Sequence, residues 1–229
     1  MYLTDYLKIS SKRFDNQRKE FVMSENVQVF VKDQITNGID IKEVLDTINV
    51  HIPAHLVREI DSIYVGIFND LLQKDVSAAF KDGAIYVSNE QESVADLVDD
   101  LVHEIAHSLE SPYGYLIYSD SKLKNEFLVK REKLYEILKA EGLNPDEKLF
   151  LECEYTKEMD DYLYKTVGYD RLNFIVSSYG LFTSAYSATS LREYFANGFE
   201  FYFLDSPHEL AQICPVLYKK IEELHYYED

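Results

Sequence analysis

The sequence predicts an α+β chain with a small N-terminal lobe of mixed sheet and helix and a mainly helical C-terminal lobe. Short segments rich in β-branched and aromatic residues occur in the first part, whereas helical-period apolar stripes dominate the second. One long amphipathic helix lies between the two parts. We therefore expect a single domain over residues 1–229, with a first lobe at 1–110 and a second lobe at 111–229.

The expected strands belong to the first lobe. Residues 27–31 and 62–66 have strand-like composition, and the region before about residue 59 otherwise contains short helical stretches. Residues 77–80 and 84–88 flank Lys81-Asp82-Gly83, where the Asp-Gly pair favours a tight turn. These last two segments are therefore predicted to form a hairpin.

An amphipathic helix is expected to follow the hairpin. Asn89, with Glu92 three residues later, has the pattern of a capping box, and Ser111-Pro112 is expected to end the helix near Glu110. Apolar residues recur at helical spacing between these limits: Val94, Leu97, Val98, Leu101, Val102, Ile105 and Leu109.

The second lobe is expected to contain two helical regions before its aromatic helix. Leu123, Phe127, Leu134 and Leu138 form an apolar stripe, which Gly142 ends. Residues 146–164 are charged and are also expected to be helical.

Residues 191–204 predict a strongly apolar, aromatic helix. The small residues Ala196 and Gly198 are expected to let it pack close to the helix that carries His103. A further capping box begins at Ser206-Pro207, and the last helical region is expected to break at Cys214-Pro215.

Residues 103–107 have the sequence His-Glu-Ile-Ala-His. Residues four apart lie on one face of a helix, so His103 and His107 can bind the same metal ion. Glu104 stands beside the metal and can take a proton from a zinc-bound water, whose pKa zinc lowers to about 7. The motif therefore predicts a zinc-dependent hydrolase with Glu104 as general base.

The third metal ligand must come from a later segment. Ser108-Leu109-Glu110 follows His107, which excludes an extended motif with a third histidine. Glu193 and Glu200 both lie on the expected aromatic helix, and their spacing alone does not choose between them.

The segment Leu-Arg-Glu-Tyr-Phe-Ala-Asn-Gly-Phe at 191–199 resembles the Glu-aromatic-Phe-Ala-x-x-Phe segment of the anthrax lethal factor-like zinc metallopeptidases. This gluzincin-type group includes the Pro-Pro endopeptidases. The resemblance covers roughly residues 103–224. It implies a zincin-like fold, one Zn²⁺ per chain, Glu193 as the third ligand, and Tyr186, seven residues earlier, as a residue that assists catalysis.

The chain also departs from the family pattern. Residues 144–181 look like an insertion between the two matching blocks, and Asn197 stands where family members usually carry Glu. The sequence contains no Trp, whereas the Pro-Pro enzymes use one near the substrate. Proline specificity is therefore not carried over to this chain.

The resulting expectation is a zinc metalloendopeptidase that acts on a peptide or protein substrate. Tyr186 would donate a hydrogen bond to the tetrahedral oxyanion, and residues 84–88 would pair with an extended substrate. One alternative is a zinc-binding pseudoenzyme or protein-interaction module without turnover. Another is a self-cleaving or partner-restricted protease whose insertion gates access.

Composition limits the partners and the location. The net charge is −18, from 41 acidic and 23 basic residues, and such a surface repels nucleic acid. No apolar run is long enough to span a bilayer, and the first residues lack the pattern of a signal peptide. Cys153 and Cys214 form no disulfide framework. We therefore expect a cytoplasmic protein without nucleic-acid or membrane partners.

Overall fold

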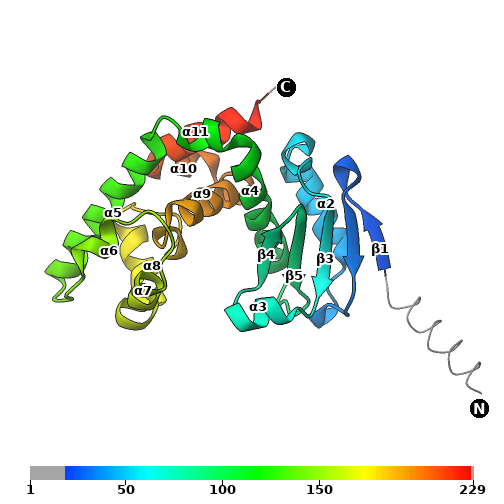
Figure 1. The fold of residues 1–229 in the computed structure, drawn as a ribbon, viewed down its shortest axis with the longest axis horizontal. Helices are drawn as coiled ribbons and strands as arrows, with labels where there is room; N and C mark the ends of the chain where they lie inside the picture. The colour runs from blue at the N-terminus through cyan, green and yellow to red at the C-terminus, as the bar shows by residue number, and fades with distance from the viewer. Residues whose placement is uncertain (1–18, 228–229) are drawn as a thin grey trace, which may run out of the picture. The chain divides into compact units, whose positions relative to one another are not determined.

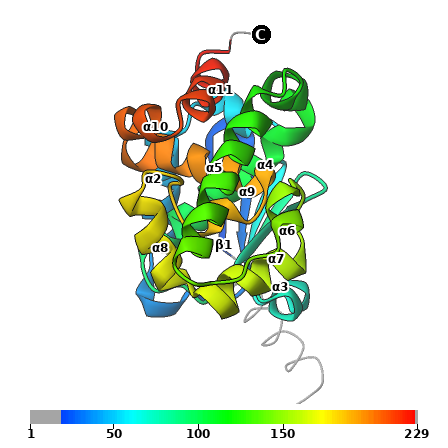
Figure 2. The same ribbon diagram turned by 90° about the vertical axis from the view of Figure 1, so that its left-hand side faces the viewer.

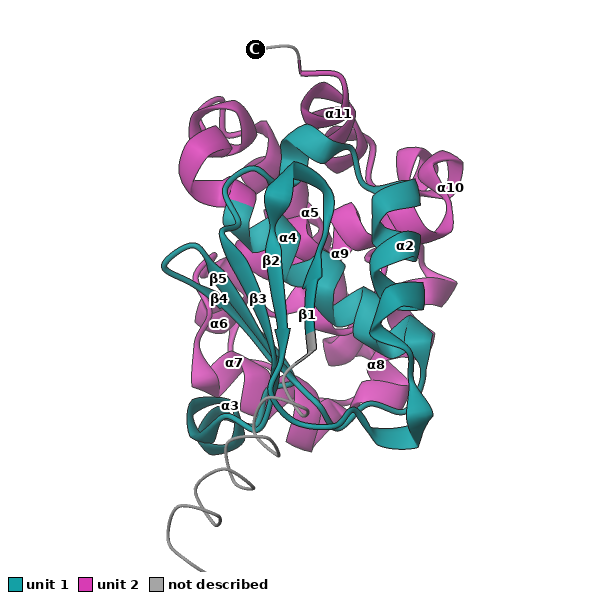
Figure 3. Ribbon diagram, turned by 90° about the vertical axis from the view of Figure 1, so that its right-hand side faces the viewer, with its two compact units in different colours: residues 1–108 teal, residues 109–229 magenta. Residues whose placement is uncertain are grey.

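The computed structural model describes residues 19–227 and divides into two compact units, the first ending at Ser108 and the second beginning at Leu109 (Figure 3). The first unit contains the sheet, and the second consists of helices and connecting segments (Figure 1). The expected α+β class with a helical second part is confirmed. Among the described residues, no helix has both the length and the apolar character needed to cross a membrane.

A five-stranded sheet forms the centre of the first unit. Its strand order is β1-β2-β3-β5-β4; the two inner pairings, β2 with β3 and β3 with β5, are parallel, and the two outer pairings are antiparallel. The strands are β1 (Lys19–Val22), β2 (Gln28–Val31), β3 (Ser62–Gly66), β4 (Ala78–Lys81) and β5 (Ala84–Ser88). Apart from β1, these are the strands that the sequence predicts.

Helices connect the strands of this unit. The main one is α2 (Ile41–His51), whose buried face consists of Ile41, Val44, Leu45 and Ile48. The short α3 (Asn69–Lys74) links β3 to β4, and 3-10 turns occur at Ser24–Asn26, Thr36–Gly38 and Ala54–Val57. The sheet core is formed by strand residues with almost no exposure: Val29, Ile63, Val65, Ile85 and Val87.

The predicted hairpin of β4 and β5 is confirmed. Asp82 and Gly83 both have positive φ, 51° and 77°, as a two-residue turn with the twist of a hairpin requires. However, β5 lies between β3 and β4 in the sheet. The expectation that residues 84–88 pair with a substrate is therefore wrong, because both edges of that strand already carry ladder hydrogen bonds. The terminal strand on this side is β4.

The long helix α4 (Val94–Tyr118) differs from its predicted limits at both ends. Its start is capped by Ser93, whose Oγ accepts from the Asp96 amide at 3.2 Å and donates to the Asp96 carboxylate at 2.9 Å. Asn89 donates instead to the carbonyl of Gln34 at 2.8 Å. The expected capping box at Asn89 is therefore wrong, because its side chain serves a long-range contact.

Pro112 lies inside α4 and does not end it. An internal proline costs a helix about 3 kcal/mol, because it removes one backbone hydrogen bond and crowds the preceding turn. The turns after it pack within the second unit: Ile117 is buried, and Tyr118 donates to Glu110 at 3.2 Å and contacts the Phe195 ring. We infer that this packing outweighs the cost of Pro112.

The second unit is formed by the end of α4 and the helices that follow (Figures 1 and 2). They are α5 (Lys122–Ala140), α6 (Glu147–Leu151), α7 (Lys157–Asp161), α8 (Tyr169–Ser178), α9 (Leu191–Glu200), α10 (Pro207–Ile213) and α11 (Pro215–His225). Shorter helical turns occur at Tyr162–Val167, Tyr186–Ala188 and Phe201–Asp205.

Most predicted helices of this unit are confirmed, with one exception, and α8 lies where no helix is predicted. The stripe of α5 is buried, Ser206 caps α10 by accepting from the Glu209 amide at 3.2 Å, and the chain breaks at Pro215. Residues 146–164, for which the sequence predicts helical structure, are divided between α6, α7 and a wider turn, with a non-helical segment between α6 and α7. The reason is tertiary: the carbonyl of Cys153, between α6 and α7, accepts from the Leu191 amide at 2.8 Å.

Candidate metal centre and its supporting contacts

His103 and His107 lie next to each other on α4 in the first unit. Their ring centroids are 4.9 Å apart, and each ring offers a nitrogen within 4.8 Å of one on the other. Both side chains are half-buried. The spacing of four residues has therefore placed both imidazoles on one helix face, as the sequence predicts, and this is a donor pair that suits a divalent transition metal.

Glu104 is only 7% exposed, and its carboxylate is held by the sheet. The Phe80 backbone N–H donates to Glu104 Oε2 at 2.6 Å. In the pairing of β4 with β5, the Ser88 N–H donates to the Ser77 carbonyl. Because the hydrogen-bonding direction alternates along a strand, the backbone N–H and C=O of Phe80 point away from β5, toward the outer edge of the sheet. Sequence reasoning missed Phe80 as a partner of Glu104.

Glu193 lies in the first turn of α9, in the second unit. Ser190 caps this helix, because its Oγ accepts from the Glu193 amide at 3.2 Å. The neighbouring Arg192 donates through Nε to Glu110 Oε2 at 2.8 Å, and this hydrogen bond raises the pKa of Arg192. The Glu110 side chain is 12% exposed. This ion pair fastens the first turn of α9 to the last turns of α4, a contact that sequence reasoning did not identify.

Tyr186 opens a 3-10 turn shortly before α9 and is linked to that helix by hydrogen bonds. The Ser184 hydroxyl donates to Asn197 Oδ1 at 2.7 Å and accepts from the Ser187 amide at 3.1 Å. Asn197 Nδ2 in turn donates to the Glu193 carbonyl at 2.9 Å. The buried amide of Asn197 therefore connects the turn that carries Tyr186 with the turn that carries Glu193.

Residues from α5, from the segment 144–181 and from α8 within it support the same turn. Asn173 on α8 accepts from the Ala185 amide at 2.7 Å. The fully buried Arg131 donates to the carbonyls of Leu149 and Thr189, and burial lowers its pKa to about 10. Together with the Cys153 contact to α9, these bonds hold the chain on both sides of Tyr186.

Two tyrosines of residues 144–181 share one carboxylate. Tyr155 and Tyr169 donate to the two oxygens of Asp160 at 3.0 and 2.9 Å. Partial burial, followed by the bond to Asp160, raises the pKa of Tyr155 to about 12, and the negative charge of Glu193 adds a small contribution. Both phenols therefore remain protonated donors at neutral pH, and Tyr155 lies within electrostatic range of Glu193.

Comparison with known proteins gave no independent indication of function. No protein-family model matches the chain, and searches of curated proteins and of solved structures found no match.

Proposed function

We propose that this chain is a zinc metalloendopeptidase of the gluzincin type, in which His103, His107 and Glu193 bind one Zn²⁺. The observation that carries the proposal is the adjacent imidazole pair on α4, with the intervening carboxylate of Glu104 fixed by the Phe80 amide. Two imidazoles and one carboxylate are a donor set that catalytic zinc uses, and three protein ligands leave a coordination position for water or substrate.

The ion pair between Arg192 and Glu110 favours Glu193 over Glu200 as the third ligand. Glu110 follows His107 by three residues on one continuous helix, so the two share a face of α4. Arg192, which binds Glu110, directly precedes Glu193. Glu200 lies seven residues further along α9, about 10 Å along the helix axis.

The two remaining residues, Glu104 and Tyr186, are proposed to act in catalysis. Zinc, when bound, acts as a Lewis acid that lowers the pKa of water and polarises a carbonyl group. Glu104 accepts a proton from the attacking water and transfers it to the leaving amine, and its bond to Phe80 fixes the orientation of the carboxylate. Tyr186 donates a hydrogen bond to the oxyanion of the tetrahedral intermediate.

We propose that the strand that pairs with the substrate backbone is β4, at its outer edge, and not β5. β4 is the terminal strand of the sheet, and its residue Phe80 already contacts Glu104 through the outward-facing N–H. The carbonyl of Phe80 and the backbone groups of Ala78 face the same way, because hydrogen-bonding direction alternates along a strand. An extended peptide on this edge would therefore pass beside the proposed general base.

The test combines metal analysis with peptide hydrolysis. The purified protein should contain about one zinc per chain, and Glu193→Gln should lose most of it, because a catalytic site needs three protein ligands. Glu200→Gln is the matched control on the same helix and should retain zinc. Glu104→Gln should retain zinc but lose about 10²-fold or more of the cleavage of a mixed peptide library, because an amide accepts no proton.

Three outcomes would contradict parts of this proposal. Loss of zinc from Glu200→Gln, with retention in Glu193→Gln, would reverse the ligand assignment. Unchanged turnover in Glu104→Gln would remove the general base. Zinc binding by the wild type without cleavage of any library peptide would favour a zinc-binding interaction module over a peptidase.

A further inference from the structure

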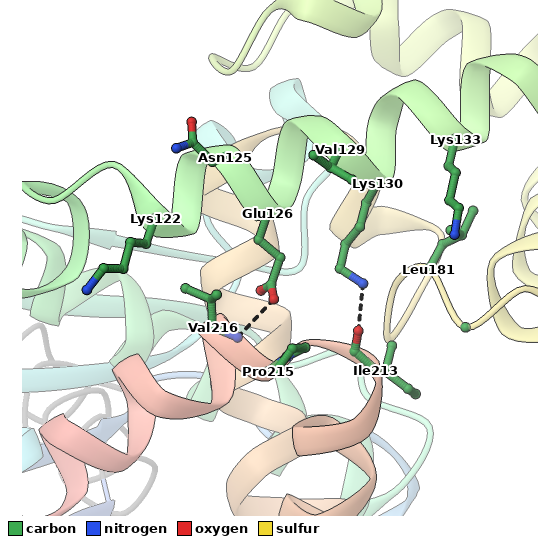
Figure 4. A pocket seen from close by; sticks show the side chains of 11 residues that line it. Lys122, Asn125, Glu126, Val129, Lys130, Lys133, Leu181, Ile213, Pro215 and Val216 are labelled. Atoms are coloured by element: carbon green, nitrogen blue, oxygen red, sulfur yellow. Dashed lines mark hydrogen bonds between the residues drawn. The ribbon is translucent and has the colours of Figure 1, made fainter.

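A concave feature lies within the second unit, formed by one face of α5, the break between α10 and α11, and residues 180–181. Figure 4 shows this pocket, which has a volume of about 520 Å³. We call it the α5 pocket. Its volume is in the range of pockets that bind small ligands or short peptide segments.

Internal hydrogen bonds fix the walls of the α5 pocket. The Glu126 carboxylate accepts from the Val216 amide at 2.8 Å (Figure 4) and from the Leu217 amide at 3.0 Å, at the start of α11. Lys130, which is 8% exposed, donates to the Ile213 carbonyl at 2.7 Å. These contacts hold α5 against both helices and fix the walls of the pocket.

The charge of α5 is opposite to that of the molecule. This helix carries six basic residues (Lys122, Lys124, Lys130, Arg131, Lys133 and Lys139) and three acidic ones (Glu126, Glu132 and Glu136), a difference of +3. Arg131 is fully buried, and the pocket lining itself has Lys122, Lys130 and Lys133 against Glu126, a difference of +2. The whole chain has a net charge of −18. Complementary charge raises the rate and selectivity of protein association. A partner attracted to α5 should therefore be acidic, although the rest of the molecule would repel it.

The pocket also has a defined length and an apolar middle. Lys122 and Lys133 line it eleven residues apart, which corresponds to about 16 Å along the helix axis. Val129, Pro215 and Val216 lie between them, and Val129 is 60% exposed. An extended peptide rises about 3.3 Å per residue with alternate side chains on one face. Its first and fifth side chains therefore lie on one face about 13 Å apart, and the long, flexible lysine side chains can cover the remaining few ångströms.

We propose that the α5 pocket is a docking site for an extended acidic segment of a partner protein. The segment would carry acidic side chains at its first and fifth positions, near Lys122 and Lys133, and an apolar side chain at its third, over Val129 and Val216. Lys122 also lies 3.2 Å from Asp120, but that pair is exposed and therefore weak. The apolar contact supplies most of the affinity, and the lysines set the direction and the charge of the segment.

The test is a binding measurement that does not depend on hydrolysis. The probe is a fluorescein-labelled peptide, Gly-Glu-Ser-Leu-Ser-Glu-Gly, titrated by fluorescence anisotropy with the full chain carrying Glu104→Gln to prevent cleavage. Lys122→Glu combined with Lys133→Glu should weaken binding about tenfold or more. Lys124→Glu combined with Lys139→Glu makes the same charge change on α5 outside the pocket lining and should change binding less than about twofold.

Two further peptides separate charge from apolar contact. Replacing both Glu residues of the probe by Gln should weaken binding about fivefold or more. Replacing its Leu by Ser should also weaken binding about fivefold or more. Circular dichroism and urea unfolding establish that each variant is folded. Equal weakening by the two lysine pairs, an unchanged affinity of the Ser peptide, or no saturable binding below about 1 mM would each overturn the proposal.

Discussion

Asn197 connects two parts of the proposed site with a single side chain. Its amide nitrogen donates to the Glu193 carbonyl while its oxygen accepts from Ser184. A carboxylate at this position could not donate to the carbonyl, whereas an amide can do both. The residue that departs from the expected family pattern is therefore suited to its surroundings, and we expect it to set the position of Tyr186 relative to Glu193.

The prediction is that Asn197 acts through Tyr186. Asn197→Ala should lower kcat about tenfold on a peptide substrate, with KM and zinc content little changed, because the lost contact positions a group that acts in the transition state. Tyr186→Phe should lower kcat by a similar amount. When Tyr186→Phe is already present, adding Asn197→Ala should lower kcat much less than Asn197→Ala lowers it in the wild type.

Ser184→Ala is the comparison for this double-mutant cycle, because it removes the hydrogen bond to Asn197 from the Ser184 side. It should lower kcat in the same direction as Asn197→Ala. If Asn197→Ala lowers kcat by the same factor in the Tyr186→Phe background as in the wild type, the two residues act independently and the positioning role is wrong.

At the scale of elements, the packing of α9 against α11 depends on one residue without a side chain. A Cβ at Gly198 would lie 2.8 Å from Leu217 Cγ and would also overlap Leu217 Cδ2. The aromatic side of α9 is buried as well, through Phe195 and Phe199. The sequence suggests that Gly198 allows close packing against the His103 helix, but the structure shows that its close neighbour is Leu217 of α11.

The corresponding prediction concerns stability. Gly198→Ala should destabilise the fold by about 1–3 kcal/mol, because overpacking a buried contact exceeds the gain of about 1 kcal/mol in helix propensity. Gly114→Ala is the matched control on α4, where an added Cβ meets nothing within 4 Å. It should be neutral or stabilising in urea unfolding. Equal effects at the two glycines would contradict the packing argument.

At the scale of the whole molecule, the excess of carboxylates makes the response to acid informative. Asp120, between α4 and α5, accepts from the Lys122 backbone amide and, at 3.1 Å, from Lys220, whose side chain is 8% exposed. The bond from Lys122 and the contact with Lys220 lower the pKa of Asp120 from 3.8 to about 2. Lys220 also donates to the Leu116 carbonyl at 2.7 Å, so this group joins α11 to the end of α4.

The sign of the pH effect follows from this lowered pKa. The contribution of ionised Asp120 is fully present above its unfolded pKa of 3.8 and is lost as the pH falls towards 2. Asp120→Asn should therefore reduce the free energy of unfolding clearly at about pH 5 and much less at about pH 2. Urea unfolding at both pH values measures the difference. If Asp120→Asn lowers the free energy of unfolding equally at the two pH values, the charge of Asp120 is not responsible for its effect.

The sequence by itself determined the features that depend on neighbouring residues. The shared face of His103 and His107, the hairpin turn at Asp82 and Gly83, and the Ser206 cap each follow from residues within a few positions of one another. Backbone geometry fixes such relations whatever the rest of the chain does. The same applies to the buried stripes of α5 and α9, because periodicity records which face avoids water.

Only the tertiary structure decided the features that depend on distant residues. Asn89 bonds to Gln34 instead of capping α4, Pro112 is retained inside that helix, and the chain at Cys153 leaves a helical path to pair with Leu191. In each case a long-range contact outweighs a local preference, which is worth about 1–3 kcal/mol at most. The contacts of Phe80 with Glu104 and of Arg192 with Glu110 were missed for the same reason. No pattern among neighbouring residues indicates which distant carboxylate a backbone amide or an arginine will bind.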